Sequence, residues 1–181
     1  MSCALDAFAH AIESYNSPKS DLISETMAIF AAKNILDVIS KEQSEFSYSD
    51  REKLIYASCA AGIAISITGT GFPHPLGYSL TLLDGIPHGA ACAVFERDYI
   101  DANMRTPDGR ERLTEFFGLV GYSREEVSSL TSKLAGCTLS LSEDEIKHHV
   151  DLVRHAGNFA NSSYVISYDE MLEIYRSHFA N

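Results

Sequence analysis

The chain has 181 residues, 45% of them apolar, which is enough for one globular domain with a substantial hydrophobic core. A net charge of -11 and a pI near 5.0 argue against nucleic acid or an anionic membrane surface as a partner, because both attract clustered Lys and Arg. No apolar run approaches the ~20 residues of a membrane span, and we expect no signal peptide.

The four cysteines show no Cys-x-x-Cys spacing, and they fall in predicted helices or at helix ends. They are Cys3, Cys59, Cys92 and Cys137. We expect buried free thiols, which suits a protein of the reducing cytoplasm. A helix with possible metal ligands begins almost at Met1, and we interpret this abrupt start as the loss, or separate encoding, of an upstream part.

Apolar residues at steps of three and four predict the first two helices. The first helix is expected over residues 3–16. Ser17-Pro18 has the pattern of an N-cap followed by proline in the first turn, so the second helix is expected to start there and run to about Lys41. Its expected buried stripe is Ile23, Met27, Phe30, Ala31, Ile35 and Val38.

A mostly polar loop is expected over 42–48, and the capping box from Ser49 to Glu52 then predicts a third helix that ends near Thr68. Small residues fill much of this helix, at positions 57–62 and 64. Because small residues allow helices to pack closely, we expect the third helix to be central and buried on several sides.

Short helices with recognisable start signals are predicted for the rest of the chain. One runs from His74 to about Leu83, and another opens at His88. Further helices are expected to open at 106–107 and at capping boxes over 123–126, 142–145 and 167–170, the middle two ending near Gly136 and Gly157. Eight or nine helices without a convincing strand predict an all-α bundle, with residues 1–181 forming a single domain.

Asp6 and His10 are candidate metal ligands, because residues four apart share one face of a helix. An isolated pair of this kind usually consists of a surface carboxylate and a half-buried imidazole. Here the flanking residues are small and apolar, which indicates that both polar groups point into the protein. Buried groups of this type need partners, and a metal ion would supply one.

His74 and His88 each follow a proline and stand at the predicted start of a helix. Histidine is an ordinary residue at such a position. Together with Asp6 and His10, however, these two histidines would give one carboxylate and three imidazoles, a suitable shell for a divalent metal. The remaining histidines are expected to be solvated or satisfied in the core; they are His148, His149, His155 and His178. Gly69-Thr-Gly71 lacks a preceding strand and is interpreted as a helix break, not as a dinucleotide-binding loop.

Three linked motifs resemble the iron-containing, or group III metal-dependent, alcohol dehydrogenase family. They are Asp6-Ala-Phe-Ala-His-Ala-Ile-Glu13, the segment from Gly69 to Thr81 with the pattern Gly-x-x-x-x-His-x-x-Gly-Tyr-x-Leu-Thr, and Ile86-Pro-His-Gly89. The stretch 166–175 also resembles the closing helix of the family. The resemblance covers essentially the whole chain but only about half of a family member.

The resemblance implies a metal-binding helical domain of the dehydroquinate synthase-like type, without the N-terminal NAD(P)-binding domain. Asp6, His10, His74 and His88 would bind Fe(II) or Zn(II), which would polarise the oxygen of a small alcohol or aldehyde for hydride transfer. NAD(P) would be used only if a separate nucleotide-binding domain is supplied. The isolated chain is therefore expected to be catalytically incomplete.

Two departures from the family pattern bear on the chemistry. Some relatives carry a histidine implicated in proton transfer four residues after the third ligand, and Tyr78 occupies that position here. Cys92 and Glu96-Arg97 stand in a segment that is usually apolar with Asn and Pro, which affects the expected substrate preference.

Two alternatives remain open at this point. The chain could be a non-catalytic metal-binding or scaffold remnant, or it could belong to the sugar-phosphate enzymes of the dehydroquinate synthase-like group. The sequence contexts of Asp6 and His88 favour the alcohol dehydrogenases over the latter. We also expect self-association, because a face that would meet a nucleotide-binding domain should be partly apolar.

Overall fold

The computed structural model describes residues 1–41 and 45–180, and within these ranges the protein is all-α. The expected loop over 42–48 therefore lies partly outside the described residues. There are ten α-helices and one 3-10 helix in the described part, and no strand beyond an isolated bridge between Leu141 and Ala180. The helices are α1 (Ser2–Asn16), α2 (Leu22–Ile39), α3 (Tyr48–Thr68), α4 (Pro73–Asp84), α5 (His88–Val94), α6 (Glu96–Asn103), α7 (Pro107–Val120), α8 (Arg124–Ala135), α9 (Glu143–Val153), η1 (Gly157–Asn161) and α10 (Tyr168–Phe179).

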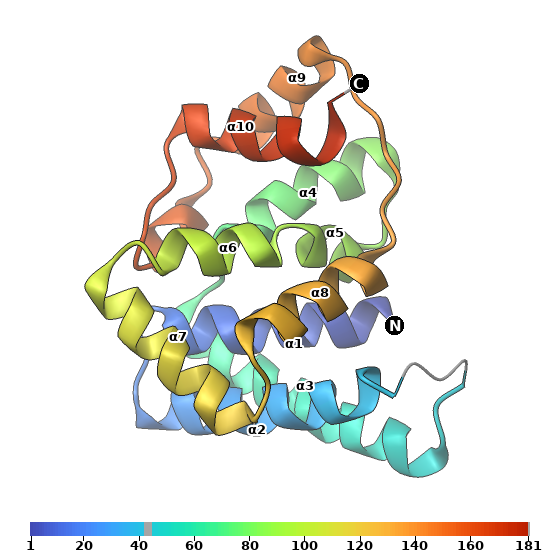
Figure 1. Cartoon of the computed structure of the whole chain (residues 1–181), viewed down its shortest axis with the longest axis vertical. Helices are drawn as coiled ribbons and strands as arrows, with labels where there is room; N and C mark the ends of the chain where they lie inside the picture. Colours follow the sequence, from blue (N-terminus) through green and yellow to red (C-terminus); the bar gives the residue numbers. More distant parts are fainter. Residues whose placement is uncertain (42–44, 181) are drawn as a thin grey trace.

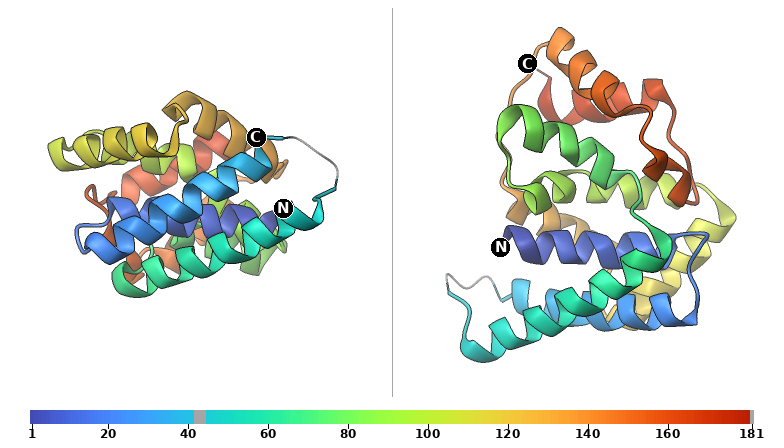
Figure 2. Two further views of the ribbon diagram at one scale, coloured as in Figure 1. Left: turned by 90° about the horizontal axis from the view of Figure 1, so that it is seen from below. Right: turned by 180° about the vertical axis from the view of Figure 1, so that it is seen from behind.

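Helix α1 runs through the middle of the molecule, as Figure 1 shows, with α2 and α3 on one side and α5 on the other. The view from behind in Figure 2 shows the same order. Eleven residues of α1 are buried, including Phe8 and Ile12, which have no exposed surface. They pack with apolar residues of α2, α3, α7 and α8 into one core. Burying a side chain of this size contributes roughly 1.5–3 kcal/mol.

A second core lies on the far side of α5 and joins α4, α6, α9 and α10. Phe72, Phe95 and Tyr175 are among its fully buried side chains. Helices α4 and α5 both contribute to this core and pack against each other. Helix α5 also packs against α1 on its other side. The region where α1, α4 and α5 meet therefore lies between the two cores.

Glycine allows α5 to approach its neighbours at two positions. A Cβ at Gly89 would lie 2.0 Å from the backbone oxygen of Ser2 and 2.7 Å from the backbone nitrogen of Asp6. A Cβ at Gly77 of α4 would lie 3.0 Å from the backbone nitrogen of Cys92. Any side chain at Gly89 would force the backbones of α1 and α5 apart, and one at Gly77 would make a very tight contact with α5.

Four of the predicted helix starts are confirmed. Thr106 accepts a hydrogen bond from the backbone N–H of Gly109, and the serines of the three later capping boxes accept bonds from N–H groups three residues on; these are Ser123, Ser142 and Ser167. The end near Gly136 is also confirmed, since Gly136 adopts the left-handed conformation after α8. The end near Gly157 is wrong: α9 ends at Val153, and Gly157 begins η1.

The predicted start and stripe of the second helix are wrong in part. Helix α2 begins at Leu22, because Asp21 and Ser24 form the capping box, whereas Ser17 accepts a bond from the backbone of Lys19 in a turn. Ile23 and Phe30, expected inside, are 59% and 49% exposed. The remaining positions of the stripe are buried or half-buried.

The third helix is less enclosed than predicted. Its capping box uses Ser47 and Asp50 in place of Ser49 and Glu52. Its buried residues are four alanines on one face, together with Asp50 and Thr68 near its ends, while Ser58, Cys59 and Gly62 are exposed. Small residues thus line the contact with α1 and α2, and the opposite side of α3 remains uncovered.

The thiols were also expected to be buried, and only Cys92 is. Cys3 and Cys59 are exposed, and Cys137 is intermediate. Among the described residues no single helix has the length and apolarity of a membrane span, although α3 and α4 pass that test jointly, with a bend of 112° between them.

Candidate metal centre

The four predicted ligands come from three helices that meet between the two cores. Asp6 and His10 lie one turn apart on α1. His74 is the second residue of α4, after Pro73, and His88 is the first residue of α5, after Pro87. Pro73 suits the first turn of α4 because its fixed φ is already helical and its missing N–H needs no partner there, whereas Pro87 is the N-cap residue of α5.

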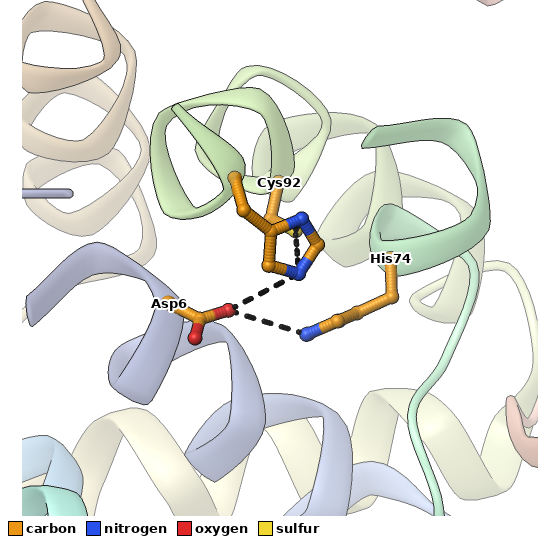
Figure 3. A group of neighbouring side chains, drawn as sticks. Asp6, His74 and Cys92 are labelled. Carbon is orange, nitrogen blue, oxygen red and sulfur yellow. Dashed lines mark hydrogen bonds and ion pairs between the residues drawn. The ribbon is translucent and has the colours of Figure 1, made fainter. Parts of the chain in front are cut away.

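The three imidazoles gather around one oxygen of Asp6. The distance from Asp6 Oδ1 to the Nε2 atom is 3.5 Å for His74, 3.5 Å for His88 and 3.8 Å for His10. Figure 3 shows Asp6 and His74 turned toward each other, with Cys92 behind the imidazole ring that also faces Asp6. These separations are longer than a good hydrogen bond, and the donor atoms enclose a common space.

Two of these atoms are buried without a hydrogen-bond partner. They are Asp6 Oδ1 and His74 Nε2. A buried polar atom without a partner costs roughly 1–3 kcal/mol, and such atoms are rare in folded proteins. A divalent ion between them would satisfy both, and one carboxylate with three imidazoles is a donor set that Zn²⁺ and Fe²⁺ accept. The residues therefore fit a metal ion.

The second acidic residue of α1 holds His74 in place. Glu13 is completely buried, and its two carboxylate oxygens lie 2.8 and 3.0 Å from Nδ1 of His74. Glu13 also accepts a hydrogen bond from the backbone N–H of Gly71. When Nδ1–H donates to Glu13, the lone pair of Nε2 is directed toward Asp6, which is the usual arrangement behind a metal-binding histidine.

The charges of the site favour a cation. Burial alone would lower the pKa of His74, but the neighbouring Glu13 and Asp6 outweigh it and raise that pKa to about 10. Burial would raise the pKa of Asp6, and the attraction of His74, His10 and His88 instead lowers it. Burial is the main cause of the lowered pKa values of His10 and His88, so these two imidazoles are neutral at neutral pH and free to bind a metal.

Cys92 also lies at this site, although its sequence context was connected with substrate preference. It follows His88 by one turn on α5, and its Sγ is 3.6 Å from His88 Nε2. Among the described residues, Asp6, His74, His88 and Cys92 offer four ligand atoms within 4.8 Å of one another. His10 is outside this tightest group, and its ring stacks on that of His74 with 4.7 Å between centroids.

Tyr78 lies one turn after His74, and its ring stacks on that of His88 with a centroid distance of 5.4 Å. It is 38% exposed, and burial of the rest raises the pKa of its phenol, so it keeps its proton at neutral pH. Glu96 is fully buried one turn after Cys92, and neither of its oxygens has a hydrogen-bond partner. Burial first, and then the charge of Glu13, raise the pKa of Glu96 well above its usual value.

The other histidines have the ordinary roles that were expected. His149 is buried, with Nδ1 3.0 Å from the hydroxyl of Ser79. His178 lies 2.7 Å from a carboxylate oxygen of Asp98. His148 and His155 are exposed.

The comparisons with known proteins agree with this fold and site. Residues 1–179 match the model of the Fe-containing alcohol dehydrogenase family, C-terminal. The chain therefore belongs to the iron-containing alcohol dehydrogenase family and corresponds to its C-terminal helical domain.

Curated proteins similar to this chain include several alcohol dehydrogenases. The NADPH-dependent butanol dehydrogenase of Clostridium saccharobutylicum is 29% identical over 94% of this chain and 48% of its own length. Alcohol dehydrogenase 4 of Saccharomyces cerevisiae is 32% identical over 67% of this chain and 32% of its own length.

Solved structures of the family superpose well on this chain. The iron-containing alcohol dehydrogenase of Thermotoga maritima has a TM-score of 0.85 and 28% identity, covering 97% of this chain and 48% of its own. Sulfoacetaldehyde reductase of Bifidobacterium kashiwanohense, solved in complex with NAD⁺, has a TM-score of 0.86 and 26% identity, covering 98% of this chain and 49% of its own. The chain spans about half the length of these proteins.

Proposed function

We propose that this chain is the metal-binding catalytic half of an NAD(P)-dependent alcohol dehydrogenase. The main support is the gathering of three imidazole Nε2 atoms around the unpartnered Oδ1 of Asp6. The ligands in this proposal are Asp6, His10, His74 and His88. Fe(II) and Zn(II) both suit these donors.

The bound ion would act as a Lewis acid toward the oxygen of an alcohol or aldehyde. Asp6 supplies the negative charge of the site, and Glu13 fixes the orientation of His74 through its Nδ1. Tyr78 retains its proton beside His88 and is partly exposed, so in this proposal it relays a proton between the substrate oxygen and solvent.

The nucleotide would be bound elsewhere. In this proposal residues 1–181 act as a single metal-binding domain, and a separate NAD(P)-binding domain supplies the hydride acceptor or donor. The names of two relatives mention NADPH and NAD⁺, which supports this class of cofactor. The substrate is a small alcohol or aldehyde, as the name butanol dehydrogenase suggests.

Metal content tests the site. Wild-type chain loaded with Fe(II) or Zn(II) and freed of excess ion should retain one ion per chain, and His74→Ala and His88→Ala should lose it. His155→Ala is the matched control, because His155 is exposed in the turn that follows α9. Equal metal content in all four proteins would refute the site.

Activity measurements test whether catalysis needs a nucleotide-binding domain in addition to this metal-binding domain. The isolated chain with metal, NAD(P) and a small alcohol should show no turnover. Addition of a nucleotide-binding domain from a family member should restore it if the interface is compatible. Robust turnover by the isolated chain would contradict its proposed incompleteness.

We further propose that the chain self-associates through the uncovered side of α3. Ile55, Tyr56, Ile63 and Ile67 recur at helical spacing there and are between 40% and 62% exposed. Contiguous apolar surface of this kind favours association. Light scattering should show a dimer or larger species, and a monomer at high concentration would contradict the proposal.

A further inference from the structure

We propose that a hollow between α6 and α8 binds a tetrahedral oxyanion, namely inorganic phosphate or the phosphate group of a small metabolite. The two helices pack against each other (Figure 1), and the hollow has a volume of about 390 Å³. It is lined by Arg97, Arg124, Glu125, Ser128, Ser129 and Ser132. None of these residues belongs to the candidate metal centre, so the proposal stands independently of the proposed function.

Two guanidinium groups from different helices line the hollow, and one carboxylate holds both of them. Oδ1 of Asp101 accepts a hydrogen bond from Arg124, and its Oδ2 lies 3.9 Å from Nε of Arg97. Asp101 balances one of the two positive charges. The side chains of Arg97 and Arg124 are 69% and 38% exposed, so N–H groups that Asp101 does not engage are accessible to a ligand. The planar fork of a guanidinium matches two oxygens of a phosphate group.

Serine hydroxyls of α8 supply further donors on the same side. Ser128 is 8% exposed, and its Oγ has no hydrogen-bond partner among the described residues. A serine or threonine inside a helix often donates to a carbonyl one turn earlier, as Thr131 does to Val127 on this helix. The hydroxyl of Ser128 makes no such bond, and a buried polar group of this kind needs a partner. Ser129 and Ser132 are exposed beside it.

The donors select the class of ligand. Two guanidinium groups and three hydroxyls can all donate to the four oxygens of a phosphate, whereas a carboxylate has only two oxygens to receive them. A water molecule takes about 30 Å³ in the liquid, so the hollow has room for such an ion and several waters. The net charge of -11 repels long polyanions and favours a small ligand. Glu125 is exposed and also lines the hollow, and its charge opposes an anion.

Titration of the full chain with inorganic phosphate tests the proposal, by calorimetry and by phosphorus NMR, at an ionic strength held constant with chloride. A chelator keeps the chain free of metal, so that phosphate cannot bind to an ion at the candidate metal centre. Wild type should bind one phosphate saturably. Arg97→Gln and Arg124→Gln should each weaken binding on the order of 10- to 100-fold, the range for losing a hydrogen bond to a charged group. Arg154→Gln is the matched control, because Arg154 also pairs with a nearby carboxylate of its own segment, Asp151.

Two further variants separate the contributions of the lining residues. Ser128→Ala should weaken phosphate binding about 2- to 10-fold, as expected for one neutral hydrogen bond. Glu125→Gln should strengthen it about 1.4- to 5-fold, because an exposed opposing charge is removed. Arg97 is largely exposed, so its variant keeps the test decisive if Arg124→Gln does not fold.

A phosphate monoester such as glycerol 3-phosphate, titrated in the same way, distinguishes the two sources of the ligand. Tighter binding than inorganic phosphate would identify a phosphorylated metabolite, and equal or weaker binding would identify free phosphate. Absence of saturable phosphate binding by the wild type in the millimolar range would overturn the site. Equal affinity in wild type, Arg97→Gln and Arg124→Gln would overturn it too, and neither result would alter the metal content that tests the proposed function.

Discussion

Replacing Glu13 with glutamine should weaken metal binding, although Glu13 is not a proposed ligand. The carboxylate holds Nδ1 of His74 at 2.8 and 3.0 Å and also accepts from the backbone N–H of Gly71. Glutamine has one acceptor oxygen, so it cannot serve both donors as the carboxylate does. The imidazole would lose the fixed direction of its Nε2 lone pair and the negative charge behind it.

The size of the effect follows from two opposing terms. Glu13 and Asp6 together outweigh burial and raise the pKa of His74 to about 10, so at neutral pH a metal must displace a proton, and Glu13→Gln eases that competition. The same carboxylate attracts a dication more strongly than a single proton charge, since Coulomb energy grows with the product of charges. The loss of attraction should therefore outweigh the easier loss of the proton. Removing the hydrogen-bond partner of a ligating histidine lowers metal affinity by about 10- to 100-fold, which corresponds to about 1.4–2.7 kcal/mol.

Zn²⁺ affinity of wild type and Glu13→Gln should be measured at pH 7 by competition with a chromophoric chelator. Asp50→Asn is the matched control, because Asp50 is a buried carboxylate that caps α3 away from the site. The metal-free melting temperature should be recorded for each, since an unmet hydrogen bond at position 13 costs about 1–3 kcal/mol. An affinity within twofold of wild type in a folded Glu13→Gln protein would refute the role of Glu13.

Three further predictions concern stability. Gly89→Ala should cost about 1–3 kcal/mol by overpacking against the backbone of α1, while Gly62→Ala, in open space on α3, should gain about 0.5–1 kcal/mol; urea melts giving the reverse order would contradict this packing. Hydrogen bonds from the capping serines of α8 and α9 lower the pKa values of Glu126 and Glu145 below 4.5. The two carboxylates therefore stabilise the folded protein fully above that pH, and this contribution is lost as pH falls through their folded-state pKa values. Acid titration of the melting temperature should show a shallower fall in the double Gln variant, and identical curves would disprove the contribution. Zn²⁺ at about 100 times its Kd should add about 2.7 kcal/mol, or roughly 5–11 °C in melting temperature, but nothing in His74→Ala; an equal shift there would place the binding elsewhere.

The helix starts that could be predicted from the sequence are those with purely local causes. The capping boxes at 123, 142 and 167 join residues three apart, and nothing distant competes with them. The start of α2 failed because Ser17-Pro18 and Asp21-x-x-Ser24 are both plausible caps four residues apart. The choice between them depends on where the chain can turn against its neighbours, and the local pattern does not contain that information.

Burial could not be predicted from residue size and helical spacing alone. Alanine, serine and glycine fit a tight interface and an open surface equally well, so the small residues of α3 could not reveal which face meets α1. The exposed Ile23 and Phe30 of α2 show the complementary error, since an apolar residue at helical spacing need not face the interior.

The candidate site shows the same division. Asp6, His10, His74 and His88 could be selected from helical spacing and proline contexts, and the structure brings them together. The spacing of His88 and Cys92 placed the thiol on the same helix face, and this signal was available in the sequence. Glu13 reaches a partner 61 residues away, and no local pattern identifies that pairing.

If the proposed metal site is occupied, the central position of α1 would make metal release and unfolding closely linked events. The helix that presents Asp6 and His10 is also the one on which both the α2–α3 side and α5 pack, with Phe8 and Ile12 fully buried. Its amide protons should therefore exchange with solvent only when most of the molecule opens. A bound ion would slow that exchange along the whole of α1. The rate of amide hydrogen exchange in this buried helix would therefore report whether the metal site is occupied.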